Sequence, residues 1–295
     1  MPLADTSQAA RTLYKRDRIL ASFRSLNPTK QLEGPRGMTP SSTLTAAHVG
    51  QRPFILNGVI VEDCCNDIAS TCGPLDPSTI ATLVGVTYTM SRNATIPDCN
   101  TVTVPPGFTF VIPSGVTLTV NGTFRVDTLT IEEGGALINN SFNTTIVLYI
   151  STIKGEVTNN GTYEAGAIAG PGILNCGPRS RTNIKGPAPS TLSGITRVKV
   201  GAKVDFGATT TFPVGSLLET DPGSTVSIAA GATANFLSSA ININGGLVTP
   251  ISSIINAVAS VVANVEAAMD RAAAAAGTPA TLPPVITVPI PVGEL

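Results

Sequence analysis

Short strands closed by glycine recur along the middle of this chain, and they constrain its fold more than any other feature. Between residues 100 and 250, runs rich in β-branched residues end at a glycine about every eight residues, as in VTLTVNG and ATTTFPVG. The closing glycines are Gly107, Gly115, Gly122, Gly134, Gly201, Gly207, Gly215, Gly223 and Gly231. Coils of strand plus turn bury little alone and build a continuous core by stacking. The pattern predicts a mainly β fold whose body, over residues 100–249, is a β-solenoid (parallel β-helix).

Alternation of apolar and polar residues within the repeats indicates which side chains enter the core. Phe110 and Ile112 fall on one side of a strand, and Ile146, Leu148 and Ile150 are expected to continue the inward set. Residues 166–190 are rich in glycine and proline, which predicts an insertion loop within the solenoid. Short, evenly spaced strands also suit a β-sandwich or jelly roll, and this is the alternative fold.

Residues 1–53 form a basic N-terminal arm. Residues 1–52 hold eight basic and three acidic residues, whereas the remainder holds ten basic and sixteen acidic residues. We expect a helix over residues 5–26 and an extended segment after it. Such an arm is expected to dock on an acidic partner, with a solvated helix as the alternative. The docking side chains are Arg11, Lys15, Arg16, Arg18 and Arg24.

Beyond Pro250 the hydrophobic period lengthens. Apolar residues over 250–276 follow alternating steps of four and three, which is the heptad pattern of a coiled coil. The predicted oligomerisation contacts are Ile251, Ile255, Val258, Val262, Val265 and Met269. A seam of β-branched residues favours a trimer, and a helix that caps its own solenoid is the alternative. Residues 277–295 are apolar and proline-rich, which favours an extended strap over a free tail.

Four of the five cysteines lie within residues 54–99, a segment expected to form a cysteine-containing region of strands and loops. Disulfide candidates in an oxidising compartment are Cys64, Cys65, Cys72 and Cys99, with free buried thiols as the alternative. The paired C-x-x-C spacing of a zinc site is absent, and His48 is the sole histidine. We therefore expect no metal site and no cofactor.

The carboxylates of the chain do not form a recognisable catalytic pair. Glycoside hydrolysis, a reaction found among parallel β-helices, needs two carboxylates about 5–10 Å apart. Glu132 and Glu133 are adjacent but precede two glycines, as expected of a solvated turn. We expect no enzyme and assign no catalytic residue. An enzyme that uses Asp127 and Asp205 from separate coils is the minor alternative.

Targeting and nucleic-acid signals are absent from the sequence. The first twenty residues contain no apolar core of a secretory signal, and no apolar run is long enough to span a membrane. The basic arm lacks the interleaved aromatic residues of nucleic-acid binders, so nucleic acid is not the expected partner.

The order of segments near the N-terminus resembles that of a class of viral proteins. A short acidic and Ser/Thr-containing start (ADTSQAARTLYKRDRILASF) is followed by a Pro/Ser segment (MTPSSTLTAAHVG) and an apolar strand that ends in VEDCC. Over about residues 4–65, this order resembles the opening of virion structural proteins of large icosahedral double-stranded DNA viruses of eukaryotes. The resemblance implies a virion component, capsid-associated or fibre-like, that self-assembles and contacts other virion proteins. It carries no catalytic residues.

These features together predict a structural protein that assembles with copies of itself into an oligomer or filament, because the apolar ends each need a partner. The alternative is an extracellular binding module, such as an adhesin or a carbohydrate- or ice-surface binder. Thr-x-Thr pairs such as Thr117/Thr119 and Thr128/Thr130 supply outward threonines for such a surface. Threonine is also a good strand former in its own right.

Overall fold

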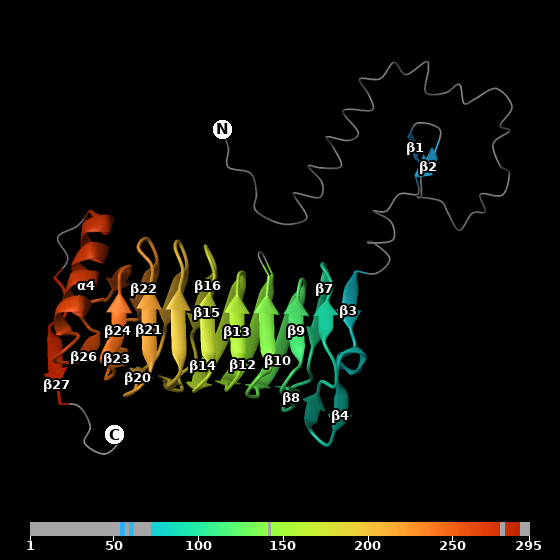
Figure 1. Cartoon of the computed structure of the whole chain (residues 1–295), viewed down its shortest axis with the longest axis horizontal. Coiled ribbons are helices and arrows are strands. Elements are labelled where there is room, and N and C mark those ends of the chain that lie inside the picture. Colours follow the sequence, from blue (N-terminus) through green and yellow to red (C-terminus); the bar gives the residue numbers. More distant parts are fainter. Residues whose placement is uncertain (1–53, 57–58, 62–71, 141–142, 278–280, 290–295) are drawn as a thin grey trace, which may run out of the picture. The chain divides into compact units, whose positions relative to one another are not determined.

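The chain divides into two compact units, residues 1–72 and 73–295. The computed structural model describes residues 54–56, 59–61, 72–140, 143–277 and 281–289. In the first unit, strands β1 (Phe54–Leu56) and β2 (Val59–Val61) pair antiparallel. The second unit is a β-solenoid of about eight coils (Figure 1). The predicted solenoid body is confirmed, and the sandwich alternative is not formed. The expected N-terminal helix lies outside the described residues.

Three parallel ladders of strands run along the solenoid. The first ladder contains β3 (Gly73–Leu75), β7 (Asn100–Thr103), the first halves of β10 (Thr123–Ile131), β12 (Thr144–Ile153) and β14 (Thr162–Gly170), then β16 (Arg181–Ile184), β19 (Lys203–Phe206), β22 (Thr225–Ile228) and β25 (Gly246–Val248). The second ladder contains β5 (Thr87–Thr89), β8 (Thr109–Ile112), the second halves of β10, β12 and β14, then β17 (Ser190–Leu192), β20 (Thr210–Phe212), β23 (Thr233–Phe236), β26 (Ile254–Val258) and β27 (Val285–Val288). The third ladder contains β6 (Ala94–Ile96), β9 (Thr117–Val120), β11 (Ala136–Asn139), β13 (Glu156–Asn159), β15 (Ile173–Cys176), β18 (Ile195–Val198), β21 (Leu217–Thr220) and β24 (Ala240–Ile243).

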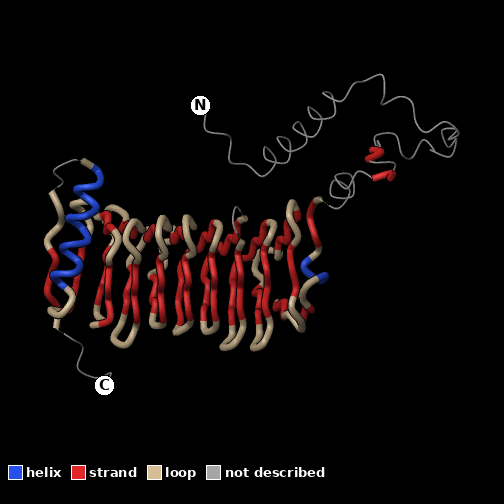
Figure 2. The backbone as a smooth tube through the Cα atoms, turned by 45° about the horizontal axis from the view of Figure 1, so that its top comes forward, coloured by secondary structure: helices blue, strands red, loops and turns tan. Residues whose placement is uncertain are grey.

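Each coil visits the three ladders in turn, and between residues 87 and 258 paired residues of neighbouring coils are 17 to 24 positions apart in the sequence. Thr144 lies beside Thr162, and Arg181 lies beside Lys203. Parallel strands need a crossover connection, and here the rest of the coil provides it. The turns between ladders form rows along the solenoid (Figure 2).

The solenoid begins earlier than residue 100. Strands β3, β5 and β6 form its first coil, together with the 3₁₀ turn η2 (Pro77–Thr79) and strand β4 (Thr82–Val84), which pairs antiparallel with β5. Residues 73–96 are therefore part of the solenoid and not a separate β and loop region. The side chains of Ala81 and Met90 are buried at this end of the core.

The core is a continuous column of inward side chains. Phe110 and Phe124 of neighbouring coils meet edge to face with ring centroids 5.0 Å apart, and Phe212 and Phe236 stack at 5.6 Å. Burying each such ring contributes about 2–3 kcal/mol relative to exposure. Repetition of this burial from coil to coil holds the stack together.

The predicted inward set in β12 is wrong by one position. Thr145, Val147 and Ser151 are buried, whereas Leu148 is half exposed. Because side chains alternate with period two, a slip of one residue exchanges the two faces of a strand. The chain turns a corner inside β12, where pairing with β10 is irregular between Val147 and Ile150.

The insertion loop predicted over residues 166–190 is also wrong, because strands β14 to β17 continue the coils through it. The glycines there permit close stacking of corners. A Cβ on Gly172 would lie 2.4 Å from the carbonyl oxygen of Gly155, and one on Gly194 would lie 2.0 Å from that of Gly172. Glycine inside a strand pattern marks such close backbone approach as readily as a loop.

At the C-terminal end, helix α4 (Val262–Ala276) follows β26 and ends at Gly277, whose φ of 69° is left-handed. The predicted helix over 250–276 is therefore shorter, because residues 254–258 form a strand. Within the predicted strap, β27 adds in parallel to β26 and extends the second ladder.

Candidate functional site

The six predicted oligomerisation contacts do not form one seam. Ile255 and Val258 are buried in strand β26, and Val265 and Met269 are buried on α4. Val262 is partly buried, and Ile251 is 58% exposed in a turn before β26. The coiled-coil prediction over these residues is wrong, since a strand and a helix share the heptad pattern between them.

Helix α4 instead covers the last coil of its own solenoid, which is the alternative that the sequence left open. The helix packs on β25, and the Cβ that Gly246 lacks would lie 3.3 Å from the Cβ of Ala272. Its Asn264 Oδ1 accepts a hydrogen bond of 2.8 Å from the backbone N–H of Ile243. Arg271 donates to the carbonyl oxygens of Gly245, at 3.1 Å, and Ile243. The helix thus satisfies polar backbone groups at the end of the third ladder.

The predicted docking residues of the N-terminal arm, Arg11, Lys15, Arg16, Arg18 and Arg24, lie outside the described residues, as do Cys64 and Cys65. Cys72 and Cys99 are disulfide-bonded. Cys176 is a free thiol on β15 with no exposed surface, and burial raises its pKa to about 11 although Thr182 lies within hydrogen-bonding distance. Such a thiol is a packing group and a poor nucleophile.

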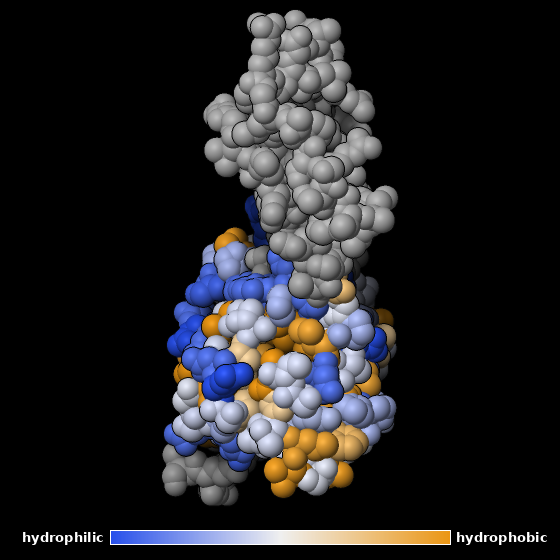
Figure 3. Space-filling model, turned by 90° about the vertical axis from the view of Figure 1, so that its right-hand side faces the viewer, coloured by the Kyte–Doolittle hydropathy of each residue, from blue (hydrophilic) through white to orange (hydrophobic). Residues whose placement is uncertain are grey.

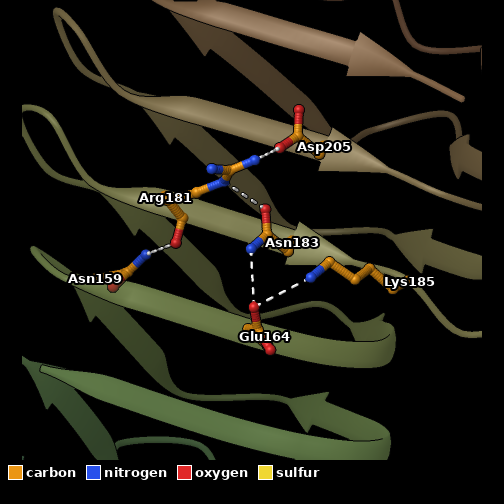
Figure 4. Close-up of polar contacts among 6 residues, drawn as sticks. All are labelled: Asn159, Glu164, Arg181, Asn183, Lys185 and Asp205. Atoms are coloured by element: carbon orange, nitrogen blue, oxygen red, sulfur yellow. Dashed lines mark hydrogen bonds and ion pairs between the residues drawn. The ribbon is translucent and has the colours of Figure 1, made fainter.

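A line of polar side chains crosses three neighbouring coils on the outer face of the first ladder (Figure 4). Glu164 on β14 accepts hydrogen bonds from Asn183, at 3.1 Å, and Lys185, at 3.2 Å. Arg181 on β16 donates to Asn183 Oδ1 at 3.0 Å and pairs with Asp205 of β19 at 3.3 Å. The alternation of donor and acceptor means that each charged group in the line already has partners.

The pKa of Glu164 reflects these partners. Partial burial disfavours its ionised form, but the hydrogen bonds from Asn183 and Lys185 and the charges of Lys185 and Arg181 outweigh burial and lower the pKa. A general acid in catalysis needs a raised pKa. Glu164 is therefore suited to a permanent ion pair.

The two acids of the enzymatic alternative are far apart and already engaged. Asp127 is buried and accepts a hydrogen bond of 2.7 Å from the backbone N–H of Gly107, while Asp205 pairs with Arg181. Their strands, β10 and β19, are four steps apart in the first ladder, or roughly 19 Å at the usual strand spacing. That separation exceeds what either glycosidase mechanism uses.

Two further findings concern the described ranges only. No group of three His, Cys, Asp or Glu side chains there is placed to hold a metal ion. No helix in those ranges is long and apolar enough to cross a membrane.

An exposed apolar pair that the sequence pattern misassigned lies at the corner of β12. Leu148 and Tyr149 are 50% and 65% exposed. In the next coil the same corner is Gly166, whose missing Cβ would lie 2.2 Å from the carbonyl oxygen of Tyr149. The pair therefore stands beside a position without a side chain. We refer to Leu148 and Tyr149 as the corner ridge. Alternation along the sequence does not predict that these side chains are exposed, because the turn within β12 interrupts the alternation.

Outward threonines form a short row near the start of the first-ladder strands. The row lies on the first ladder, in four successive coils, and each side chain is partly exposed. Its members are Thr101, Thr123, Thr144 and Thr162. Arg181 occupies the next place and ends it. The sequence showed the threonines but not this alignment, because the coil length was not known.

The chain matches no family model, no curated protein and no solved structure.

Proposed function

We propose that this protein is a non-catalytic structural component that assembles with copies of itself, as a capsid-associated or fibre-like part of a viral particle. The observation that carries the structural role is the direction of its ion pairs. Each of the five pairs among the described residues joins two neighbouring coils, so the charges brace the solenoid along its stack. A single exposed pair contributes about 1 kcal/mol or less. Ion pairs repeated along the solenoid axis are suited to a structural protein that must resist separation of its coils.

The viral setting of this proposal rests on the resemblance of residues 4–65 to virion structural proteins. Immunogold labelling of purified viral particles tests this setting. The particles come from the organism that supplies the gene, and the antibodies are raised against the full-length chain. Labelling of the particle shell or of its projections is expected. Recovery of the chain only from the soluble fraction, with unlabelled particles, would overturn the viral role.

The non-catalytic role is tested separately on the purified full-length chain. Incubation with a panel of neutral and acidic polysaccharides is expected to release no reducing ends. Turnover that disappears in Asp205→Asn would contradict the proposal and restore the enzymatic alternative.

A binding module is the second candidate, and two exposed features, the corner ridge and the threonine row, favour it. An exposed tyrosine ring can stack on a sugar ring, and outward hydroxyl groups elsewhere on the same coils can donate and accept hydrogen bonds. A glycan array probed with the wild type, Tyr149→Ala and Tyr149→Phe distinguishes the two candidates. Binding that Phe retains and Ala loses would support the module, and Val200→Ala, at an exposed position on another corner, is the control.

A further inference from the structure

The second ladder ends in an exposed strand at both ends of the solenoid. At its start, β4 pairs with β5 on one side, and no described strand pairs with its other side. At its finish, β27 pairs with β26 on one side, and again no described strand lies on the other. Unpaired edge strands present rows of N–H and C=O groups that template pairing with another chain.

The β4 edge is apolar as well as unpaired. All three residues of β4 are exposed, and Leu83, Val84 and Val86 expose 44%, 72% and 62% of their surface. Apolar surface gathers at the lower edge of this end of the solenoid (Figure 3), where Figure 1 places the hairpin of β4 and β5. Three exposed aliphatic side chains in one hairpin form a patch of the kind that marks an interaction site.

The β27 edge has matching properties. Ile286 is 48% exposed, and prolines at 283, 284 and 289 flank the four-residue strand. Proline has no backbone N–H to donate to a β-ladder, so strand pairing is confined to these four residues. This length is close to that of β4, which has three residues. Helix α4 packs mainly on β25, the last strand of the first ladder, and also contacts β24, β26 and β27. Among the described strands, none pairs with the outer side of β27, so this edge of the second ladder is open to extension.

We propose that copies of this chain assemble head to tail, with β27 of one copy pairing with β4 of the next and continuing the second ladder. The occupant of each edge is a second copy because the two edges are opposite ends of the same ladder. β4 runs antiparallel to the rest of the ladder, so the new pair is antiparallel. The contact joins different surfaces and leaves both outer ends free, which generates a filament and not a closed ring.

The inference deepens the proposed self-assembly and rests on it. It is tested on the full-length chain with Val84→Lys and Ile286→Lys, which place a charge on one edge each, at positions already exposed. Val200→Lys, at a position 55% exposed on a lateral corner, is the matched control. Mass is measured by light scattering over a wide concentration range, and particle length by negative-stain electron microscopy.

We expect the wild type and Val200→Lys to form filaments whose mass grows in multiples of 30.1 kDa. Each edge variant alone stays monomeric, because every copy has the same end blocked. An equimolar mixture of the two edge variants forms dimers and nothing larger, since one intact β27 edge meets one intact β4 edge.

Other outcomes overturn the inference. A monomeric wild type, filaments that survive both lysines, or a mixture that stays monomeric would each exclude the β27–β4 junction. A monomeric wild type would overturn the proposed self-assembly as well, whereas filaments that survive both lysines, or a mixture that stays monomeric beside a filamentous wild type, would remove only the β27–β4 junction. Failure of the rest of the proposed function appears separately, as polysaccharide turnover or unlabelled particles. A wild type that assembles through a lateral face would leave the structural role standing and remove only the end-to-end contact.

Discussion

Two asparagines replace apolar residues in one inward row of the third ladder. The row runs Val120, Asn139, Asn159, Cys176 and Val198 from coil to coil. Asn159 accepts from Asn139 Nδ2 at 2.9 Å and donates to the carbonyl oxygen of Arg181, also at 2.9 Å. A buried amide is tolerated where it forms hydrogen bonds with neighbouring polar groups, as Asn159 does here.

Substitution Asn159→Ala is expected to lower the free energy of unfolding by about 2–3 kcal/mol, because it strands several buried polar groups. Denaturant titration measures the loss. The control is Asn175→Ala on the neighbouring strand β15, where the amide contacts Glu156 on the outer face at 2.8 Å. Equal losses of unfolding free energy for the two variants would show that the inward row contributes no more to stability than the outer face.

The thiol of Cys176 is expected to resist alkylation in the folded protein. With a pKa of about 11, roughly one thiol in a thousand is ionised at pH 8, and burial also blocks the reagent. Mass spectrometry of the Cys176 peptide after iodoacetamide treatment reads this residue alone. Labelling is expected only after unfolding in guanidinium, and rapid labelling of the native chain would contradict the buried placement.

The same pKa gives a sign for the pH dependence of stability. The pKa of the thiol in the folded protein is raised above its ordinary value of 9.0. The contribution of the protonated thiol to the free energy of unfolding is therefore complete below pH 9 and is lost as the pH rises from about 9 to 11. Burial raises the pKa of Tyr163 in the same direction, against a hydrogen bond to Ser151. Alkali is therefore expected to loosen these middle coils.

At the scale of elements, α4 and β27 together finish the stack. The open strand ends of a solenoid need covering, and terminal repeats with a polar outer face commonly provide it. On α4, Val265, Ala268 and Met269 are buried against the coils, whereas Ala267 and Glu266 are exposed. The helix is thus amphipathic toward its own chain.

Two adjacent alanines of α4 give a matched test of the cap. Ala268→Asp places a charge against the apolar end of the core and is expected to cost roughly 3 kcal/mol, whereas Ala267→Asp, on the outer face, costs less than about 1 kcal/mol. Helix propensity is the same in both, so thermal or chemical unfolding reports burial alone. If both variants were equally stable, α4 would not be docked on β25.

At the scale of the whole solenoid, stability is a sum over coils and the contacts between neighbours. A central strand such as β13 pairs on both sides, with β11 and β15, whereas β4 pairs on one side only. End coils therefore have fewer interactions to hold them closed.

Native-state hydrogen exchange should reveal this gradient. Amides of the strands from β11 to β19 are expected to exchange slowest, and those of the β4–β5 hairpin fastest among the strands of residues 73–288. Amides of β27 should exchange at an intermediate rate, since α4 also contacts this strand. Uniform protection from end to end would mean that the unit unfolds as a single cooperative block.

The sequence by itself determined the solenoid and most of its inward residues, because strand alternation and glycine-closed turns are local signals that survive in any β-solenoid. Phe110, Leu118 and Phe206 lie inside, as their alternation predicts. It also indicated an apolar C-terminal region that needed a partner.

Only the tertiary structure decided which surface the apolar C-terminal region packs against. An apolar face such as Val265 and Met269 satisfies a neighbouring subunit or its own chain equally well, and nothing local in the sequence distinguishes the two. The coil length, which varies from 17 to 24 residues, cannot be read from the sequence either, and it brings Glu164 beside Lys185 and aligns the threonine row. The corners of the coils account for the remaining differences from the sequence prediction. A turn inside β12 places Leu148 on the outer surface. Glycines such as Gly172 are explained by close stacking of backbones and not by a loop.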